Sequence, residues 1–223
     1  MQFLFNDEAG KSSLKLKGEE YKYLFKVRRH NVDDVLYFRT RVKSEELHTY
    51  RVVSLDGRCA SLEHISMEVK EIKPEKELHI AWCVVDPKSV EKVLPSLNEI
   101  GVAKISFIYC ARSQKNFKTD LQRYERILET SSQQCGRSKP IIFDVYKNLD
   151  DFLSAYPQTI VLDFCDEVLT CDNEVSTVLI GCEGGFSQEE REKMQKLKRF
   201  RLDTPMILRS ESAAMSIAAK VLI

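Results

Sequence analysis

The sequence lacks a surplus of charge, a long apolar run and a paired-cysteine motif, and each absence excludes a class of protein. Lys and Arg together number 34, as do Asp and Glu, so the net charge of +0 indicates no partner by itself. The apolar runs at residues 80–85 and 177–180 are far shorter than the ~20 residues that cross a bilayer. The N-terminus turns acidic at once, without the apolar stretch of a signal peptide. We therefore expect a cytoplasmic protein with no membrane segment.

The seven cysteines are odd in number and scattered, and no two of them form a CxxC pair. Several lie inside apolar runs, where a free thiol behaves as a small hydrophobic side chain. This pattern is typical of a reducing compartment, and it predicts neither a disulfide framework nor a metal site.

The 223 residues divide into two segments of different texture. Residues 1–72 carry short alternating runs, such as Leu14–Lys17, and the turn dipeptide Asp56-Gly57, which together favour a small β-barrel or sandwich. In residues 73–223, apolar strand-like runs alternate with segments of helical spacing, and Gly101 is placed to end one of those helices. The fold class expected is therefore α/β, with a mostly parallel sheet covered by helices and a small N-terminal β domain.

Two stretches are rich in Lys and Arg. In residues 21–51 basic side chains, among them Lys26, Arg28 and Arg29, alternate with tyrosine and phenylalanine, which suits a phosphate backbone and its bases. The alternative is that the aromatics are core and the charges a solvated face. The second stretch has Gln134 as a possible reader of base edges, although helical Lys and Arg are often merely solubilising. Its basic residues are Arg112, Lys115, Lys118, Arg123, Arg126, Arg137 and Lys139.

A glycine-rich loop is the sharpest local feature. Gly181, Gly184 and Gly185 stand between an apolar strand and a helix that Ser187 and Glu190 open as a capping box. Glycines let a ligand approach the backbone closely. Their spacing fits neither GxGxxG nor a P-loop. Glu183 within the loop would repel phosphate, which favours a neutral or cationic ligand. The alternative is an ordinary tight turn from strand to helix.

The last helix is predicted from Ser210 onward, with Ser210 as its cap. Small and apolar residues, Ala213 to Val221, form one stripe, and the apolar end of the chain is expected to be buried. Arg209, Glu211 and Ser212 stand at the helix entrance, where the dipole and free N–H groups are available. A satisfied Arg–Glu pair explains these residues as well as a catalytic role does.

Taken together, the segments at residues 26–29, 99–102, 110–113, 134–137, 180–187 and 207–213 resemble the RsmE-type ribosomal RNA methyltransferases of the SPOUT superfamily. The resemblance spans nearly the whole chain. It departs from the family at Cys182, where proline is usual, at Asp203-Thr204, where Leu-Gly is usual, and at Met206, where arginine is common.

The resemblance implies a PUA-like RNA-binding barrel over residues 1–72 and a SPOUT methyltransferase domain with a trefoil knot over residues 73–223. It also implies a homodimer, S-adenosylmethionine as cofactor, no metal, and methylation of N3 of a uridine, family position 1498, in 16S rRNA of the small ribosomal subunit. RNA contacts are expected at Lys26, Arg28, Arg29, Arg112, Gln134 and Arg137. Cofactor contacts are expected at Leu162, Gly181, Glu183, Gly184, Gly185, Leu202, Met206, Ile207 and Leu208.

Uridine N3 carries a proton at neutral pH, so the reaction needs a base or a cation that stabilises the developing anion. We expect Arg209 to be that cation and Glu211 or Glu183 to be the base or an orienting group. Two other functions stay open from the residues alone: a non-catalytic RNA-binding factor of ribosome assembly, and an α/β enzyme acting on a small molecule.

Overall fold

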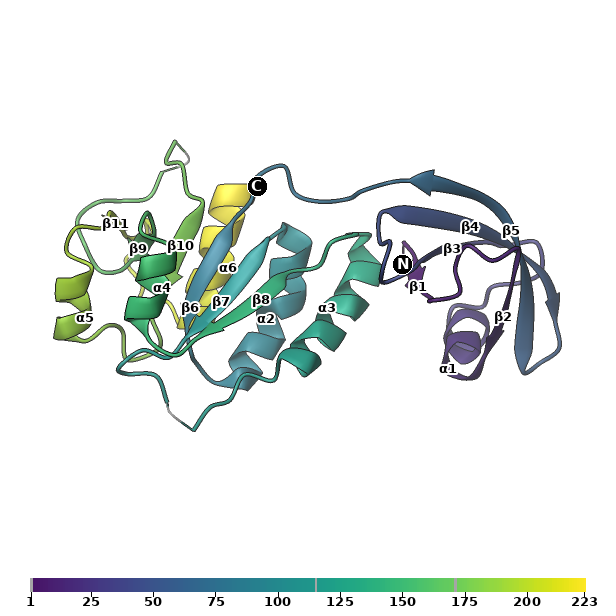
Figure 1. Cartoon of the computed structure of the whole chain (residues 1–223), viewed down its shortest axis with the longest axis horizontal. Coiled ribbons are helices and arrows are strands. Elements are labelled where there is room, and N and C mark those ends of the chain that lie inside the picture. Colours follow the sequence, from purple (N-terminus) through teal and green to yellow (C-terminus); the bar gives the residue numbers. More distant parts are fainter. Residues whose placement is uncertain (1, 115, 171) are drawn as a thin grey trace. The chain divides into compact units, whose positions relative to one another are not determined.

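The computed structural model describes residues 2–114, 116–170 and 172–223. The chain forms two compact units (Figure 1). The first comprises Met1–Lys73 together with Ser132–Lys139, and the second comprises Pro74–Ser131 together with Pro140–Ile223. None of the helices in these described ranges is long and apolar enough to cross a membrane.

The first unit is built on a mixed five-stranded sheet with the order β1-β3-β4-β5-β2. β1 is parallel to β3 and the other neighbours are antiparallel. The alternation expected from the sequence is present in β2, where Leu14 and Leu16 are buried while Lys15 and Lys17 are exposed. The strands are β1 (Leu4–Phe5), β2 (Ser13–Lys17), β3 (Val35–Arg39), β4 (Glu46–Leu55) and β5 (Cys59–Val69).

Two short helical segments between β2 and β3 were not expected from the sequence. They are α1 (Gly18–Tyr21) and the π-helical η1 (Lys22–Val27), which bury Tyr21, Leu24 and Phe25 in the core of this unit. Helical spacing over so few residues is too short to stand out from the surrounding strand pattern.

Residues 132–139 join the first unit across a long sequence separation. The backbone N–H of Ile72 donates to Ser138 Oγ at 2.9 Å, and Ser138 N donates back to the Ile72 carbonyl at 3.0 Å. The side-chain oxygen of Gln133 accepts from Phe5 N at 2.9 Å. The division at residues 72 and 73 and the roles assigned to the two halves stay predictions.

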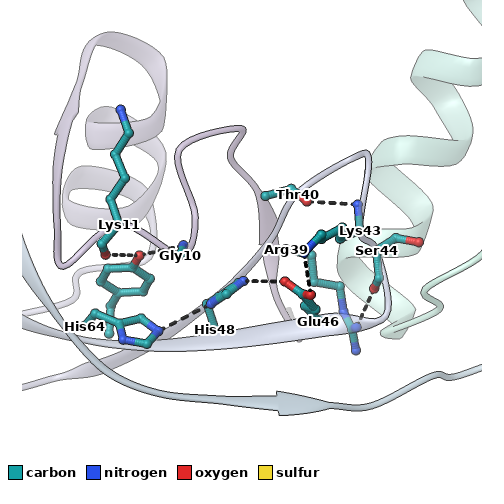
Figure 2. A network of polar contacts seen from close by, with 10 residues as sticks. Gly10, Lys11, Arg39, Thr40, Lys43, Ser44, Glu46, His48 and His64 are labelled. Carbon is teal, nitrogen blue, oxygen red and sulfur yellow. Dashed lines mark hydrogen bonds and ion pairs between the residues drawn. The ribbon is translucent and has the colours of Figure 1, made fainter.

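A polar network crosses the first unit (Figure 2). Tyr50 is fully buried, and its hydroxyl donates to the Lys11 carbonyl at 2.7 Å. His48 Nδ1 lies 3.3 Å from His64 Nε2, and His48 Nε2 lies 3.5 Å from a Glu46 carboxylate oxygen. Burial, and then the neighbouring His64, lower the pKa of His48, so this folded unit favours the neutral ring.

The second unit contains a six-stranded, all-parallel sheet with the order β11-β9-β10-β6-β7-β8. Every residue of the central strand β6 is buried, as expected of a strand covered on both faces. The α/β fold class is confirmed. The strands are β6 (His79–Cys83), β7 (Lys104–Ile108), β8 (Ile142–Tyr146), β9 (Ile160–Leu162), β10 (Thr177–Ile180) and β11 (Arg199–Phe200).

The helices of this unit follow the local signals closely. α2 begins at Pro87, after an Asp86 cap, and ends where Gly101 adopts a left-handed φ of 111°. The capping box of Ser187 and Glu190 opens α5 as predicted. α2 and α6 pack against each other (Figure 1). The helices are α2 (Pro87–Ile100), α3 (Leu121–Cys135, from Ser132 on part of the first unit), α4 (Leu149–Ala155), α5 (Gln188–Lys193) and α6 (Ser210–Leu222).

Two expectations about α6 are wrong. The chain end is not buried, because Ile223 is 89% exposed and Val221 only half-buried. Ser210 is not the cap, because Arg209 occupies the cap position and Ser210 is the first helical residue. The Ser210 hydroxyl is used for a long-range contact instead.

Candidate active site

A cavity of about 350 Å³ lies at the carboxyl ends of β9 and β10, which end at Leu162 and Ile180. Ligands of parallel α/β sheets bind at this edge, because the loops that leave the strands meet there. Its wall is made by the residues after β9, by the glycine loop, and by the segment that leads into α6. The lining residues are Leu162, Asp163, Phe164, Ile180, Gly181, Cys182, Glu183, Gly185, Phe186, Arg201, Leu202, Thr204, Met206, Ile207, Leu208, Arg209, Ser210 and Ala213.

The glycine loop folds back on itself tightly. Gly185 N donates to the Cys182 carbonyl at 2.9 Å, and Gly185 adopts a left-handed φ of 64°, which favours glycine. A Cβ at Gly181 would lie 3.4 Å from Gly185 Cα and 3.4 Å from the Phe186 ring. Cys182, which stands where the family usually has proline, is buried in this turn. At Gly181 and Gly185 the loop therefore presents backbone, with no side chain, to the cavity.

The loop is held to the start of α6 by a buried hydroxyl. Trp82 Nε1, in the middle of the sheet, donates to Ser210 Oγ at 2.7 Å. Ser210 Oγ in turn donates to the Gly181 carbonyl at 2.6 Å. Trp82 is fully buried and Ser210 is nearly so, which makes these bonds costly to lose.

An ion pair lies beside the cavity, at the end of β9. The Asp163 side chain, only 5% exposed, lies just after β9 and is bound by both terminal nitrogens of Arg191 on α5. The contact from Arg191 Nη2 to Asp163 Oδ1 is 3.1 Å. A Cβ on Gly185 would lie 3.9 Å from that same nitrogen. Arg191 thus connects α5, the glycine loop and the end of β9.

The structure brings most of the predicted cofactor residues onto one cavity wall. Eight of the nine line it, and Gly184 does not; its carbonyl accepts a hydrogen bond from Arg112 at 2.6 Å. Arg209 and Glu183 also line the cavity, whereas Glu211 lies in the first turn of α6 and is not among the lining residues. In the described ranges no carboxylate lies within 4 Å of the Arg209 guanidinium. That cation is free to meet a substrate anion.

The predicted RNA-binding residues lie in different settings. Lys26 is exposed on η1, and Arg28 donates to the Tyr23 hydroxyl at 2.9 Å. Arg29 adopts a left-handed φ of 61°, an uncommon conformation for a residue with a side chain. Gln134 is exposed. Arg137 is buried, which lowers its pKa to about 10. Arg112 is exposed, and Lys115 lies outside the described residues.

Sequence reasoning missed Trp82, Asp163, Phe186 and Arg191. Trp82 lies in β6 and Arg191 in α5, and nothing in the local pattern connected either to the loop. Phe186 lies in the loop itself, but its apolar side chain carried no signal of a role in the cavity. A usable signal existed only for Asp163, which directly follows the apolar end of a parallel strand. Among the described residues no cluster of three or more His, Cys, Asp or Glu side chains could hold a metal ion.

A parallel α/β sheet with a glycine loop and a cationic side chain at its carboxyl edge is typical of a ligand-binding protein, and comparison gives the class of this one. Residues 72–222 match the family model described as RNA methyltransferase domain. The ribosomal RNA small subunit methyltransferases E of two Helicobacter pylori strains, ATCC 700392 / 26695 and J99, are 36% identical over 98% of both chains. The chain belongs to this family of ribosomal RNA small subunit methyltransferases.

A solved structure gives the same fold. A ribosomal RNA small subunit methyltransferase E from Neisseria gonorrhoeae, bound to S-adenosyl methionine, aligns with a TM-score of 0.77 over 98% of this chain and 95% of that one. The two sequences share only 16% identity. The family resemblance read from the sequence is thus confirmed, as is the expectation of an rRNA methyltransferase.

Proposed function

We propose that this chain transfers a methyl group from S-adenosylmethionine to N3 of the uridine at family position 1498 in 16S rRNA of the small ribosomal subunit. The observation that carries the proposal is the cavity at the carboxyl ends of β9 and β10, framed by the glycine loop and residues 202–208. Support comes from the relatives in Helicobacter pylori, which are named for small-subunit rRNA methylation, and from the Neisseria gonorrhoeae structure, named for its bound S-adenosyl methionine.

The cavity fits this cofactor in size and chemistry. Its volume of about 350 Å³ lies in the range of small-molecule sites. Leu162, Leu202 and Leu208 offer apolar surface for an adenine ring, and the glycines leave room for close backbone contact. The carboxylate of Glu183 on the wall complements a ligand that carries positive charge, whereas that of Asp163 is already paired with Arg191. When bound, the cofactor supplies an electrophilic methyl group on a sulfonium sulfur.

The side chains at the cavity mouth are suited to activating the uridine. Arg209 can donate hydrogen bonds to the uracil oxygen on which negative charge develops as the N3 proton leaves. Glu183 lines the cavity and is the better placed carboxylate to accept that proton, because Glu211, in the first turn of α6, is not among the lining residues. Positioning of the nitrogen in line with the methyl group supplies much of the remaining rate enhancement.

The same surface also favours a homodimer. Phe164, Met206 and Ile207 are 72%, 65% and 82% exposed, and all three line the cavity mouth. Apolar side chains gathered at one place on a surface commonly mark an interface. A second copy would cover them and close the cofactor site. Light scattering of the wild type and of Phe164→Glu tests this: the wild type is expected to be a dimer and the variant a monomer.

Mass mapping of 16S rRNA from a strain lacking this protein tests the main proposal. One methylated uridine is expected to disappear, and to return with the wild-type chain but not with Arg209→Ala. Calorimetry with the purified chain is expected to show binding of S-adenosylmethionine. An unchanged set of modified nucleosides would overturn the proposal.

A further inference from the structure

A short turn is bound to the glycine loop by one hydrogen bond and to α5 by another. The turn, residues 110–113, closes on itself by mutual bonds between Cys110 and Ser113. Ala111 N then donates to Glu190 Oε1 at 2.7 Å. Arg112 Nη1 donates to the Gly184 carbonyl at 2.6 Å. The turn thus touches the glycine loop at Gly184 and the start of α5 at Glu190.

Glu190 is held firmly in place where the turn contacts α5. It is buried, and its second oxygen, Oε2, accepts from Ser187 N at 2.8 Å as part of the capping box. Both carboxylate oxygens are therefore bound to backbone N–H groups, one in the turn and one at the start of α5. The turn cannot move away without breaking a charge-assisted hydrogen bond.

At Gly184 the contact is also steric. A Cβ there would lie 3.3 Å from Arg112 Cβ and 3.4 Å from Arg112 Cδ, so the stem of the arginine lies directly against the glycine. The guanidinium and the stem together fix the orientation of the peptide between Gly184 and Gly185. Glu183 and Gly185, on either side of Gly184, both line the cofactor cavity.

The guanidinium of Arg112 has further N–H donors that can bind a ligand. Arginine carries five N–H donors, and Nη1 of Arg112 serves Gly184. Arg112 is exposed, and in the ranges the structure describes no carboxylate lies within 4 Å of it. An exposed arginine fork binds an oxyanion such as a phosphate by two parallel hydrogen bonds.

We propose that Arg112 is a positioning residue that couples RNA binding to the cofactor loop. This inference rests on the proposed function of the same site. A backbone phosphate bound to the outer donors restrains the guanidinium while Nη1 holds the Gly184 carbonyl, which preorganises the glycine loop for the cofactor. Because coupling between two ligands is reciprocal, the cofactor must raise the affinity for RNA by the same factor.

The test measures that factor in a binding cycle. The probes are S-adenosylhomocysteine, which cannot react, and a 16S rRNA fragment containing the target uridine. In the wild type we expect the RNA fragment to tighten S-adenosylhomocysteine binding about fivefold or more, within the usual range of such coupling. In Arg112→Ala the factor is expected to fall to about one. Arg112→Lys keeps the charge without the planar fork and is expected to restore only part of it.

Arg126→Ala is the matched control. Arg126 is an exposed arginine of the same basic stretch, and its Nε donates to the Gln122 carbonyl on its own helix. Its loss is expected to weaken RNA binding through charge alone and to leave the coupling factor unchanged. Wild-type coupling in Arg112→Ala, or an equal loss in Arg126→Ala, would overturn the inference. A wild type that binds neither probe would instead overturn the proposed function.

Discussion

Trp82 and Ser210 are 128 residues apart in the chain, yet the indole N–H of the first donates to the hydroxyl of the second at 2.7 Å. The hydroxyl passes the contact on to the carbonyl of Gly181. The central strand, the last helix and the glycine loop are thereby joined through one oxygen atom. Since Trp82 is the single tryptophan of the chain, its fluorescence reports on this junction and on the unfolding of the second unit.

Ser210→Ala is expected to destabilise the second unit by about 1–3 kcal/mol, because a buried N–H loses its acceptor and a carbonyl its donor. Urea unfolding followed by Trp82 fluorescence measures this. Cofactor affinity should fall as well, since the Gly181 carbonyl is released. Ser210→Thr keeps the hydroxyl and should stay near wild type; equal losses in both variants would show that the hydroxyl is not the cause.

Arg209→Ala is expected to lower turnover by about 10²–10³-fold, the usual cost of removing one donor to a developing oxyanion. Cofactor affinity should change little. Single-turnover methylation of a 16S rRNA fragment and calorimetry separate the two effects. Arg201 also lines the cavity, so Arg201→Ala is the comparison variant. It is expected to bind the cofactor more weakly but to turn over at a nearly normal rate when the cofactor is saturating. Normal turnover in Arg209→Ala would contradict this role.

Breaking the ion pair between Asp163 and Arg191 should weaken cofactor binding. Asp163→Asn leaves the charge of Arg191 without its partner, and Arg191→Met does the same to the largely buried charge of Asp163. The double variant is expected to recover part of the loss. A double-mutant cycle on the cofactor Kd tests this, and strictly additive losses would mean that the pair does not act as a unit. Lys193→Met, on the same helix, is the control, since its ion pair with Asp150 is exposed.

The second unit should become less stable in acid because of His79. Burial lowers the pKa of this ring to about 4, below the 6.5 of an exposed histidine. The unfolded chain therefore binds the extra proton between these values, so the contribution is complete above pH 6.5 and is lost as the pH falls towards 4. The loss amounts to up to about 3 kcal/mol. Trp82 fluorescence in urea measures it, and His79→Gln should flatten the slope.

His48 should give the first unit a similar dependence. Its pKa is lowered by burial and then by His64, so the stability it contributes is present above pH 6.5 and declines below it. Far-UV circular dichroism in urea at pH 7.5 and 5.5, beside the tryptophan signal, separates the two units. His48→Gln should remove the difference between the two pH values. His30→Gln replaces a partly exposed ring and should leave the difference in stability between the two pH values unchanged.

Short-range features could be predicted from the sequence. The alternation of Leu14 and Leu16, the glycine that ends α2, and the capping box of Ser187 and Glu190 each involve partners only a few residues apart. α1 and η1 were not predicted, because they are too short for a helical spacing of apolar residues to be recognised. The exposure of Ile223 was not predicted, because apolar character alone does not tell which face of a helix end meets the core.

The sequence by itself determined the class of the sheet, the glycine loop and the chemical types available at its rim. Only the tertiary structure decided that Ser210 serves Trp82 and Gly181, that Arg191 holds Asp163, and that residues 132–139 belong with the first unit. Periodicity and helix caps depend on interactions within a few residues, so the local sequence is enough to predict them. Contacts between distant residues depend on strand order, here β9-β10-β6, which packing of the whole chain selects.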